Sequence, residues 1–252
     1  MKGLTTPRLA YAGFALLMTL GAGLTPRAQA APVTTAWAGP GTSPGGVAAS
    51  ALSGFYAVSD RVTDSVEVRD VNQQVLATIS RAQIVSAFPW MTLDNAIDGP
   101  TSMALSDSGR LLFVAVADES TAPDGQPDDG ILRYDTQTGE LTRFVRVNWY
   151  AGFAQPGEVT LAHFKGKLYF ATPGGLGMYS AGTNDLTGTQ QAFAPAGSAN
   201  DVTGMTVDRL TSTLYYTAYN GSSTTLYTFP AGGVSATVRA TFASQRYGAI
   251  AW

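Results

Sequence analysis

Short apolar stretches separated by polar turns run through the chain from residue 54 onward. The stretch GFYAVSDRVTDSVEVRDVNQQVLATI, residues 54–79, predicts three strands joined by two polar turns, because its apolar and polar residues alternate with a period of two. The later segments between apolar stretches are rich in Gly, Asp, Asn and Ser, which favour turns, and no segment between them has a helical period. The pattern therefore predicts an all-β fold.

The strand pattern repeats along the chain. The segments GFYAVSD, LLFVAVAD, KLYFATP and TLYYTAY share one centre, and aligning Tyr56, Phe113, Tyr169 and Tyr215 gives spacings of 57, 56 and 46 residues. One blade of a β-propeller takes about 40–50 residues, so each repeat fits one four-stranded antiparallel blade. Full blades are expected at about residues 99–147, 157–195 and 200–243, with three further strands at 54–79.

The first blade needs a fourth strand, and two segments could supply it. In the favoured interpretation the terminal stretch YGAIAW, Tyr247–Trp252, pairs with the first blade and closes a four-bladed ring, which hides sheet edges that would otherwise promote aggregation. In the alternative, GGVAAS at Gly45–Ser50 is the innermost strand of that blade, and residues 248–252 begin a fifth blade. The favoured interpretation gives a signal peptide at 1–30, a Pro/Gly-rich lead-in at 31–53 and a β-propeller domain at 54–252.

The first repeat resembles a known bacterial family. FYAVSDRVTDSVEVRDVNQQVLATI is similar to the YVTN-type repeat of bacterial surface and lactonase-like β-propellers, and PTSMALSDSGRLLFVAVAD resembles the inner half of the same unit, with its Ser-Asp-x-Gly-Arg turn at residues 106–110. The third and fourth blades match only loosely. The resemblance implies a propeller fold. Most relatives have seven blades, whereas four are expected here.

The N-terminal residues predict export. Lys2 and Arg8 precede an apolar run from Leu9 to Leu24, and Ala28-Gln29-Ala30 follows, which is the pattern of a signal peptide cut after Ala30. We therefore expect a secreted, periplasmic or cell-surface protein, with no membrane attachment after cleavage. Cleavage leaves 12 basic and 18 acidic side chains, a net charge of −6, which argues against nucleic acid as a partner. The chain has no cysteine, which excludes disulfides and thiolate chemistry.

Acidic and aromatic residues gather in the loops expected at one end of the propeller. These loops join strand four of one blade to strand one of the next, and strand two to strand three within a blade. Carboxylate oxygens suit calcium, so a calcium site is a candidate. The spacing fits no EF-hand, and the alternative is a solvated loop whose Pro, Gly and Asp residues form turns. The proposed ligands of the calcium site are Asp118, Glu119, Asp124, Asp128 and Asp129.

Aromatic rings beside carboxylates also bind sugars or peptides, although tryptophans that fill gaps between blades would show the same pattern. The candidate ligand-binding residues are Trp90, Asp94, Asp98, Trp149 and Tyr150.

Two functions follow from these residues. The first is a non-catalytic binding or scaffold module whose partner is a carbohydrate, a peptide or another envelope protein, without a cofactor unless calcium binds. The alternative, implied by the lactonase-like resemblance, is a metal-dependent hydrolase with Glu158, Asn200 and Asp201 near the central channel. His163, the only histidine, lies on an expected innermost strand, which favours a packing role over catalysis.

Overall fold

Sixteen strands and one short helix make up the described part of the chain. The computed structural model describes residues 44–50, 53–93, 98–118, 129–146, 160–171, 178–182, 191–193, 201–230 and 236–243. The strands form four antiparallel sheets of four strands each, and within each sheet the strands lie in sequence order. The predicted all-β fold of four-stranded blades is confirmed.

The first two sheets, called blades 1 and 2, come from residues 44–146. Blade 1 consists of β1 (Pro44–Ser50), β2 (Phe55–Asp60), β3 (Ser65–Asp70) and β4 (Val75–Ile79). The helix α1 (Arg81–Ala87) follows it. Blade 2 consists of β5 (Gly99–Leu105), β6 (Leu111–Ala117), β7 (Gly130–Asp135) and β8 (Leu141–Arg146).

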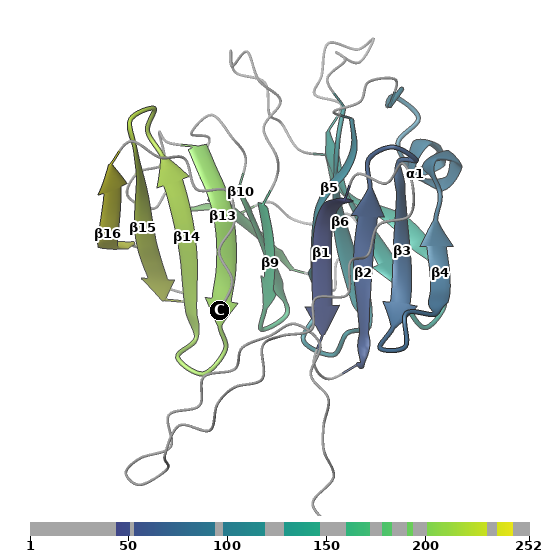
Figure 1. The fold of residues 1–252 in the computed structure, drawn as a ribbon, viewed down its shortest axis with the longest axis horizontal. Coiled ribbons are helices and arrows are strands. Elements are labelled where there is room, and N and C mark those ends of the chain that lie inside the picture. The colour runs from purple at the N-terminus through teal and green to yellow at the C-terminus, as the bar shows by residue number, and fades with distance from the viewer. Residues whose placement is uncertain are drawn as a thin grey trace, which may run out of the picture. The chain divides into compact units, whose positions relative to one another are not determined.

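The other two sheets, blades 3 and 4, follow the same order. Blade 3 consists of β9 (Thr160–Phe164), β10 (Lys167–Ala171), β11 (Met178–Gly182) and β12 (Gln191–Phe193). Blade 4 consists of β13 (Asp201–Asp208), β14 (Thr213–Tyr219), β15 (Ser223–Pro230) and β16 (Thr237–Ala243). Figure 1 shows blades 1 and 4 as separate sheets, each with its strands side by side in chain order.

Each blade buries apolar side chains against its neighbour in the chain. Because side chains alternate between the two sides of a strand, each sheet has a forward face toward the next blade and a back face toward the preceding one. The core between blades 1 and 2 includes Ala57, Val66 and Val68 on the forward face of blade 1, packed on Leu112, Val114 and Val116 on the back face of blade 2.

Two further cores repeat this arrangement. Phe113, Ala115 and Ile131 of blade 2 pack with Leu161, Leu168 and Phe170 of blade 3. Ala162, Phe164 and Tyr169 of blade 3 pack with Leu214, Tyr216 and Phe229 of blade 4. The innermost strands lie against one another in the same order, β1 on β5, β5 on β9 and β9 on β13.

The strand beside β2 is β1, which corrects the favoured prediction of how blade 1 is completed. Ala48 pairs with Ala57 and Ala49 with Tyr56, so the alternative segment supplies the innermost strand. β1 begins at Pro44, within the stretch expected to be a lead-in. The predicted terminal strand, Tyr247–Trp252, lies outside the described residues. The position that it was expected to take, beside β2, is filled by β1.

The helix α1 was not predicted from the apolar pattern. Its N-cap is Ser80, whose hydroxyl accepts the Gln83 backbone N–H while the Gln83 side chain accepts the Ser80 backbone N–H. This is a capping box, in which the two residues satisfy each other's backbone donors at the start of a helix. Only Ile84 of this seven-residue helix is buried, so the sequence shows no repeated apolar position with a helical period.

The residue of blade 1 that matches Phe113 of blade 2 lies one position away from the predicted Tyr56. Phe55 and Ala57 belong to the core between blades 1 and 2, so Tyr56 lies on the opposite, back face. In blades 2 and 3, however, Phe113 and Tyr169 lie on the forward faces. A slip of one residue moves every side chain of a strand to the other face, and Phe55 rather than Tyr56 therefore matches Phe113.

Within the described ranges, the structure contains no helix that is long and apolar enough to cross a membrane.

Candidate functional site

The structure describes four of the predicted site residues, and they lie at the loop end of blades 1 and 2. They are Trp90, Asp98, Asp118 and Asp129. The other six candidates, Asp94, Glu119, Asp124, Asp128, Trp149 and Tyr150, lie outside the described residues. The four that are described have different surroundings, and only Trp90 presents an aromatic ring with charged groups against it.

Trp90 follows α1 and is held between the apolar core and two arginines of blade 2. Its ring centroid lies 5.5 Å from that of Phe88, and the residue packs partly against the core between blades 1 and 2. The guanidinium of Arg143 lies 5.2 Å from the Trp90 ring centroid, and that of Arg146 lies 4.2 Å away. Cations at this distance over an indole ring are attracted by its negative face. Trp90 thus fills a gap between blades and also stays half-buried, with two positive charges beside it.

Asp98 is fully buried, so its carboxylate is not open to an external ligand. It lies close to Asp64, which is also buried and whose Oδ2 lies 3.6 Å from a guanidinium nitrogen of Arg81. Burial raises the pKa of the Asp64 carboxyl, Arg81 lowers it, and the negative charges of Asp98 and Asp60 raise it further. These carboxylates are part of the packing between blades 1 and 2.

Asp118 and Asp129 hold the two ends of the acidic loop. One carboxylate oxygen of Asp118 accepts backbone N–H groups of Thr92 at 2.6 Å and Leu93 at 3.4 Å. The Asp118 backbone N–H donates to the Asp129 carboxylate at 2.8 Å. These bonds tie the loop after β6 to the segment after α1. Among the described residues no three acidic or histidine side chains are placed to hold a metal ion. With Glu119, Asp124 and Asp128 outside these ranges, the calcium site stays a prediction.

A second polar cluster lies in the turns that connect the first strand to the second strand within blades 2, 3 and 4. The sequence analysis did not predict it. Asp107 accepts the Lys165 backbone N–H at 2.9 Å and forms an ion pair with Arg209. The Lys165 ammonium donates to the Ser212 hydroxyl at 3.0 Å. One carboxylate of blade 2 therefore binds a turn of blade 3 and a turn of blade 4. We call these four residues the turn cluster.

His163 lies beneath the turn cluster, packed between blades 2 and 3. Its ring is stacked on Phe113 at a centroid distance of 5.9 Å, and its Nδ1 lies 3.6 Å from an Asp107 carboxylate oxygen, beyond ordinary hydrogen-bond distance. Within the part of the chain that the structure describes, neither ring nitrogen has a hydrogen-bond partner. Burial lowers the pKa of the imidazole, and this effect exceeds the opposing influence of Asp107. A neutral, packed histidine agrees with the structural role predicted for it.

The buried imidazole should make the stability of the protein depend on pH. With a pKa below the ordinary value of about 6.5, His163 takes up its proton in the unfolded chain first. Its contribution to the free energy of unfolding is therefore constant above about pH 6.5 and falls as the pH drops toward the folded-state pKa. The slope from this one group is at most about 1.4 kcal/mol per pH unit.

Denaturant unfolding at pH 7.5 and pH 5.5 measures this effect. Because the chain has one histidine, His163→Gln should remove this part of the decrease. Asp107, Lys165 and Arg209 remain in the variant and keep their own contributions. If the variant lost as much stability as the natural chain between the two pH values, the assignment to His163 would be wrong.

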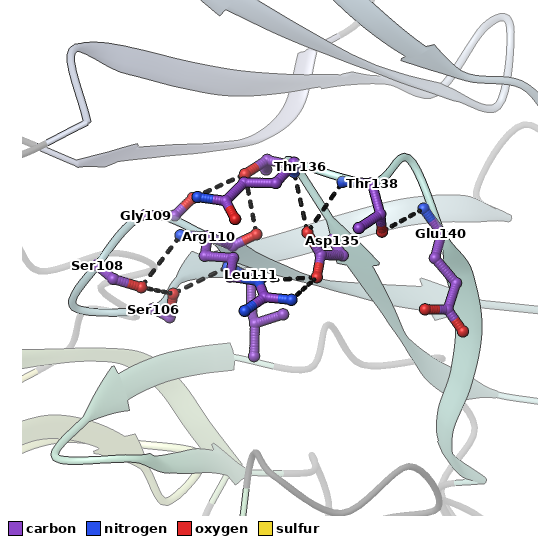
Figure 2. A network of polar contacts seen from close by, with 10 residues as sticks. Ser106, Ser108, Gly109, Arg110, Leu111, Asp135, Thr136, Thr138 and Glu140 are labelled. Carbon is purple, nitrogen blue, oxygen red and sulfur yellow. Dashed lines mark hydrogen bonds and ion pairs between the residues drawn. The ribbon is translucent and has the colours of Figure 1, made fainter.

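The hairpin turns of blade 2 carry a third network, shown in Figure 2, which explains the Ser-Asp-x-Gly-Arg motif. Arg110 Nε donates to Asp135 Oδ2 at 2.9 Å, and Asp135 Oδ1 accepts the backbone N–H groups of Gln137 at 2.9 Å and Thr138 at 3.2 Å. The Ser106 hydroxyl accepts the Leu111 backbone N–H at 2.9 Å. Arg110 and these turn bonds hold the pKa of Asp135 below its ordinary value. The motif therefore joins two turns of one blade and leaves Asp135 engaged on both oxygens.

Comparison with known proteins shows which fold the chain has but assigns it to no family. No protein-family model and no curated protein matches the chain. Among solved structures, hydrazine synthase of Kuenenia stuttgartiensis is similar at 15% identity and a TM-score of 0.55, covering 81% of this chain and 49% of that one.

Two further structures give the same result. The allergen Mala s 1 of Malassezia sympodialis matches at 10% identity and a TM-score of 0.56, covering 79% of this chain and 63% of its own. The nidogen/laminin complex matches at 14% identity and a TM-score of 0.52, covering 80% of this chain and 64% of its own. The chain thus spans about half to two thirds of the length of these structures. Identities this low establish the fold alone. That fold is a β-propeller, and the described residues form four four-stranded blades of it.

Proposed function

We propose that the chain is an exported, non-catalytic binding module that recognises a peptide segment of a partner protein through Trp90. The observation that carries the proposal is the half-buried Trp90 ring with Arg143 and Arg146 against it. Aromatic rings and arginines are enriched where protein partners bind most strongly. The two guanidiniums favour a partner segment with acidic side chains next to an apolar one. The signal-peptide pattern of residues 1–30 supports export.

The surroundings of Trp90 suit such a contact. Phe88 and the core beneath it fix one side of the ring, so little conformational entropy would be lost when a partner binds. Arg143 is exposed and Arg146 half-buried, both on β8, an outer strand of blade 2. The nidogen/laminin structure is a complex of a matched protein with another protein, which supports protein recognition by this fold.

A display library of random 12-residue peptides, selected on the purified chain, tests this function. Selected peptides should combine Asp or Glu with an apolar residue, and their affinity should fall as salt rises from 50 to 500 mM. Trp90→Ala and Arg143→Gln should each weaken binding of a selected peptide about tenfold, the effect of about 1.4 kcal/mol. Lys167→Gln, which removes an exposed charge from blade 3, is the matched control and should leave the affinity unchanged.

Two results would contradict the proposal. One is a set of selected peptides whose binding is the same with and without the Trp90 ring. The other is binding of defined oligosaccharides in a glycan array that depends on Trp90, without selection of any peptide, because this would make the partner a carbohydrate. Both are read from binding and are independent of any catalytic assay.

The metal-dependent hydrolase stays a prediction. Glu158 and Asn200 lie outside the described residues, as does the side chain of Asp201, so their convergence on one channel position is not described.

A further inference from the structure

The turn between β14 and β15 contains the only Asn-Gly pair of the sequence. Of the six asparagines in the chain, Asn220 alone precedes a glycine, Gly221. Both residues are exposed, and Gly221 has a positive φ of 93°. A Cβ added to Gly221 would meet no atom within 4 Å apart from its chain neighbours. The peptide bond that follows the Asn220 side chain thus lies open to solvent.

The carbonyl oxygen of the Asn220 side chain accepts hydrogen bonds from the two residues after Gly221. The backbone N–H of Ser222 lies 3.0 Å from Asn220 Oδ1, and that of Ser223 lies 2.8 Å away. The hydroxyls of both serines also donate to Oδ1, at 3.0 Å and 3.2 Å. A backbone N–H can only donate, so the atom it meets is the side-chain oxygen rather than the nitrogen Nδ2. Donors aimed at this oxygen stabilise a negative charge that develops on it.

The two nitrogens beside this carbonyl are not engaged elsewhere. Among the described residues, no acceptor binds Nδ2 of Asn220 or the backbone N–H of Gly221. The turn around them is held by other groups. The Tyr219 hydroxyl donates to the Gly221 carbonyl at 2.7 Å, and the Asn220 backbone N–H donates to the Ser223 carbonyl at 3.1 Å. A nitrogen that could attack the side-chain carbonyl and a nitrogen that could leave it are therefore both available.

We propose that Asn220 is a site of spontaneous modification, at which the Gly221 backbone nitrogen closes a cyclic imide on the Asn220 side chain. The Gly221 N–H gives its proton to hydroxide, and the nitrogen attacks Asn220 Cγ, which places the negative charge on Oδ1. The Cγ–Nδ2 bond then breaks, and Nδ2 takes a proton from water and leaves as ammonia. Water later opens one of the two imide carbonyls and yields an aspartyl or an isoaspartyl linkage. The reaction needs only hydroxide and water.

The modification changes both the charge and the backbone of this turn. Each product replaces a neutral amide by a carboxylate, and the isoaspartyl form also adds one methylene to the main chain between β14 and β15. The hydrogen bond from the Asn220 N–H to the Ser223 carbonyl closes this turn, next to the pairing of Tyr219 with Thr224. A longer main chain moves these groups out of register, so the turn should loosen as the protein ages.

Peptide mapping by mass spectrometry of the purified full chain, incubated at pH 8 and at pH 6, tests the proposal. Asn220 should lose ammonia at pH 8 and more slowly at pH 6, because the attacking nitrogen must first give up its proton. Asn72 is the internal control, since it is also exposed in a turn but is followed by Gln73. Its Nδ2 donates to Asp70 at 3.3 Å, and among the described residues no donor binds its side-chain oxygen. Asn72 should stay unmodified while Asn220 reacts.

Two variants separate the effect of the sequence from that of the turn. Gly221→Ala places a methyl group beside the attacking nitrogen and should slow the reaction by about tenfold or more. Ser222→Ala combined with Ser223→Ala keeps the Asn-Gly pair but removes two donors from Oδ1. This double variant should react about tenfold more slowly than the natural chain, which corresponds to about 1.4 kcal/mol. Circular dichroism shows that each variant is folded.

Three results would overturn the proposal. The first is a loss of ammonia at Asn220 that is no faster than at Asn72. The second is an equal rate in the natural chain and in the double serine variant, because the donors on Oδ1 would then have no influence. The third is a reaction that begins only when the chain is unfolded in urea, which would mean that the folded turn protects the Asn-Gly pair.

Discussion

Phe113→Ala is expected to lower the free energy of unfolding by about 3–5 kcal/mol, the cost of replacing a fully buried phenylalanine and leaving a cavity. Phe113 lies in the core between blades 2 and 3, edge-on to Phe144 at a centroid distance of 5.2 Å and stacked on His163. Its loss therefore removes contacts on both sides of one interface. Denaturant unfolding followed by circular dichroism measures the change.

Two further variants make the Phe113 result interpretable. Phe113→Leu keeps most of the apolar volume and should cost about 1 kcal/mol, which gives a folded protein even if the alanine variant fails to fold. Leu210→Ala removes a large apolar side chain that is 92% exposed, and it should change stability by less than about 0.5 kcal/mol. Equal losses for Leu210→Ala and Phe113→Ala would show that burial between blades is not what stabilises the fold.

Gly46→Val is expected to cost about 3 kcal/mol, because β1 and β5 approach too closely there for a side chain. A Cβ on Gly46 would lie 2.6 Å from the Thr101 carbonyl oxygen and 3.3 Å from the Cα of Ser102, both backbone atoms of β5. The Gly46 backbone N–H also donates to the Ser59 hydroxyl at 2.7 Å, which fixes its position within blade 1. Any side chain must therefore push blades 1 and 2 apart.

A graded series tests the close approach at Gly46. Gly46→Ala should cost about 1–2 kcal/mol in denaturant unfolding and Gly46→Val more, since overpacking grows with the volume inserted. A valine variant as stable as the alanine variant, or either one as stable as the natural chain, would mean that the strands separate there without cost.

The repeat pattern predicted the fold well because every blade obeys the same two rules. Strand segments alternate apolar and polar residues, and Gly- and Asp-rich turns separate them, so LLFVAVAD and TLYYTAY predict β6 and β14 with nearly correct ends. The turn at Asp135–Gly139, which joins β7 to β8, has the Asp and Gly residues that favour such turns.

The predictions of individual elements were wrong where contacts with a neighbouring blade, and not the local sequence pattern, decide the structure. β1 has few large side chains, and its glycines are there because β5 lies close by, so the segment reads as a lead-in rather than a strand. The Phe55/Tyr56 slip followed from matching aromatic residues by type, whereas the face that each one occupies is decided by the neighbouring blade. The Ser80–Gln83 capping box was the one local signal that could have revealed α1.

The candidate site was harder to predict than the fold. Trp90 was identified from its type and loop position, but Arg143 and Arg146 lie more than fifty residues later and meet it only through the packing of α1 on β8. The turn cluster likewise combines residues from three blades, and no spacing within one repeat indicates it. Asp98, predicted as a ligand contact, is fully buried close to Asp64, and its position in the sequence does not indicate that burial.

The succession of inter-blade cores has a consequence for how such chains arise and diverge. Each core depends on two adjoining sheets, so a repeat duplicated or deleted at one end leaves the interior contacts as they were. Only the terminal surfaces change partners. Gene duplication can therefore alter the number of repeats in small steps, and selection needs to refit a single junction each time.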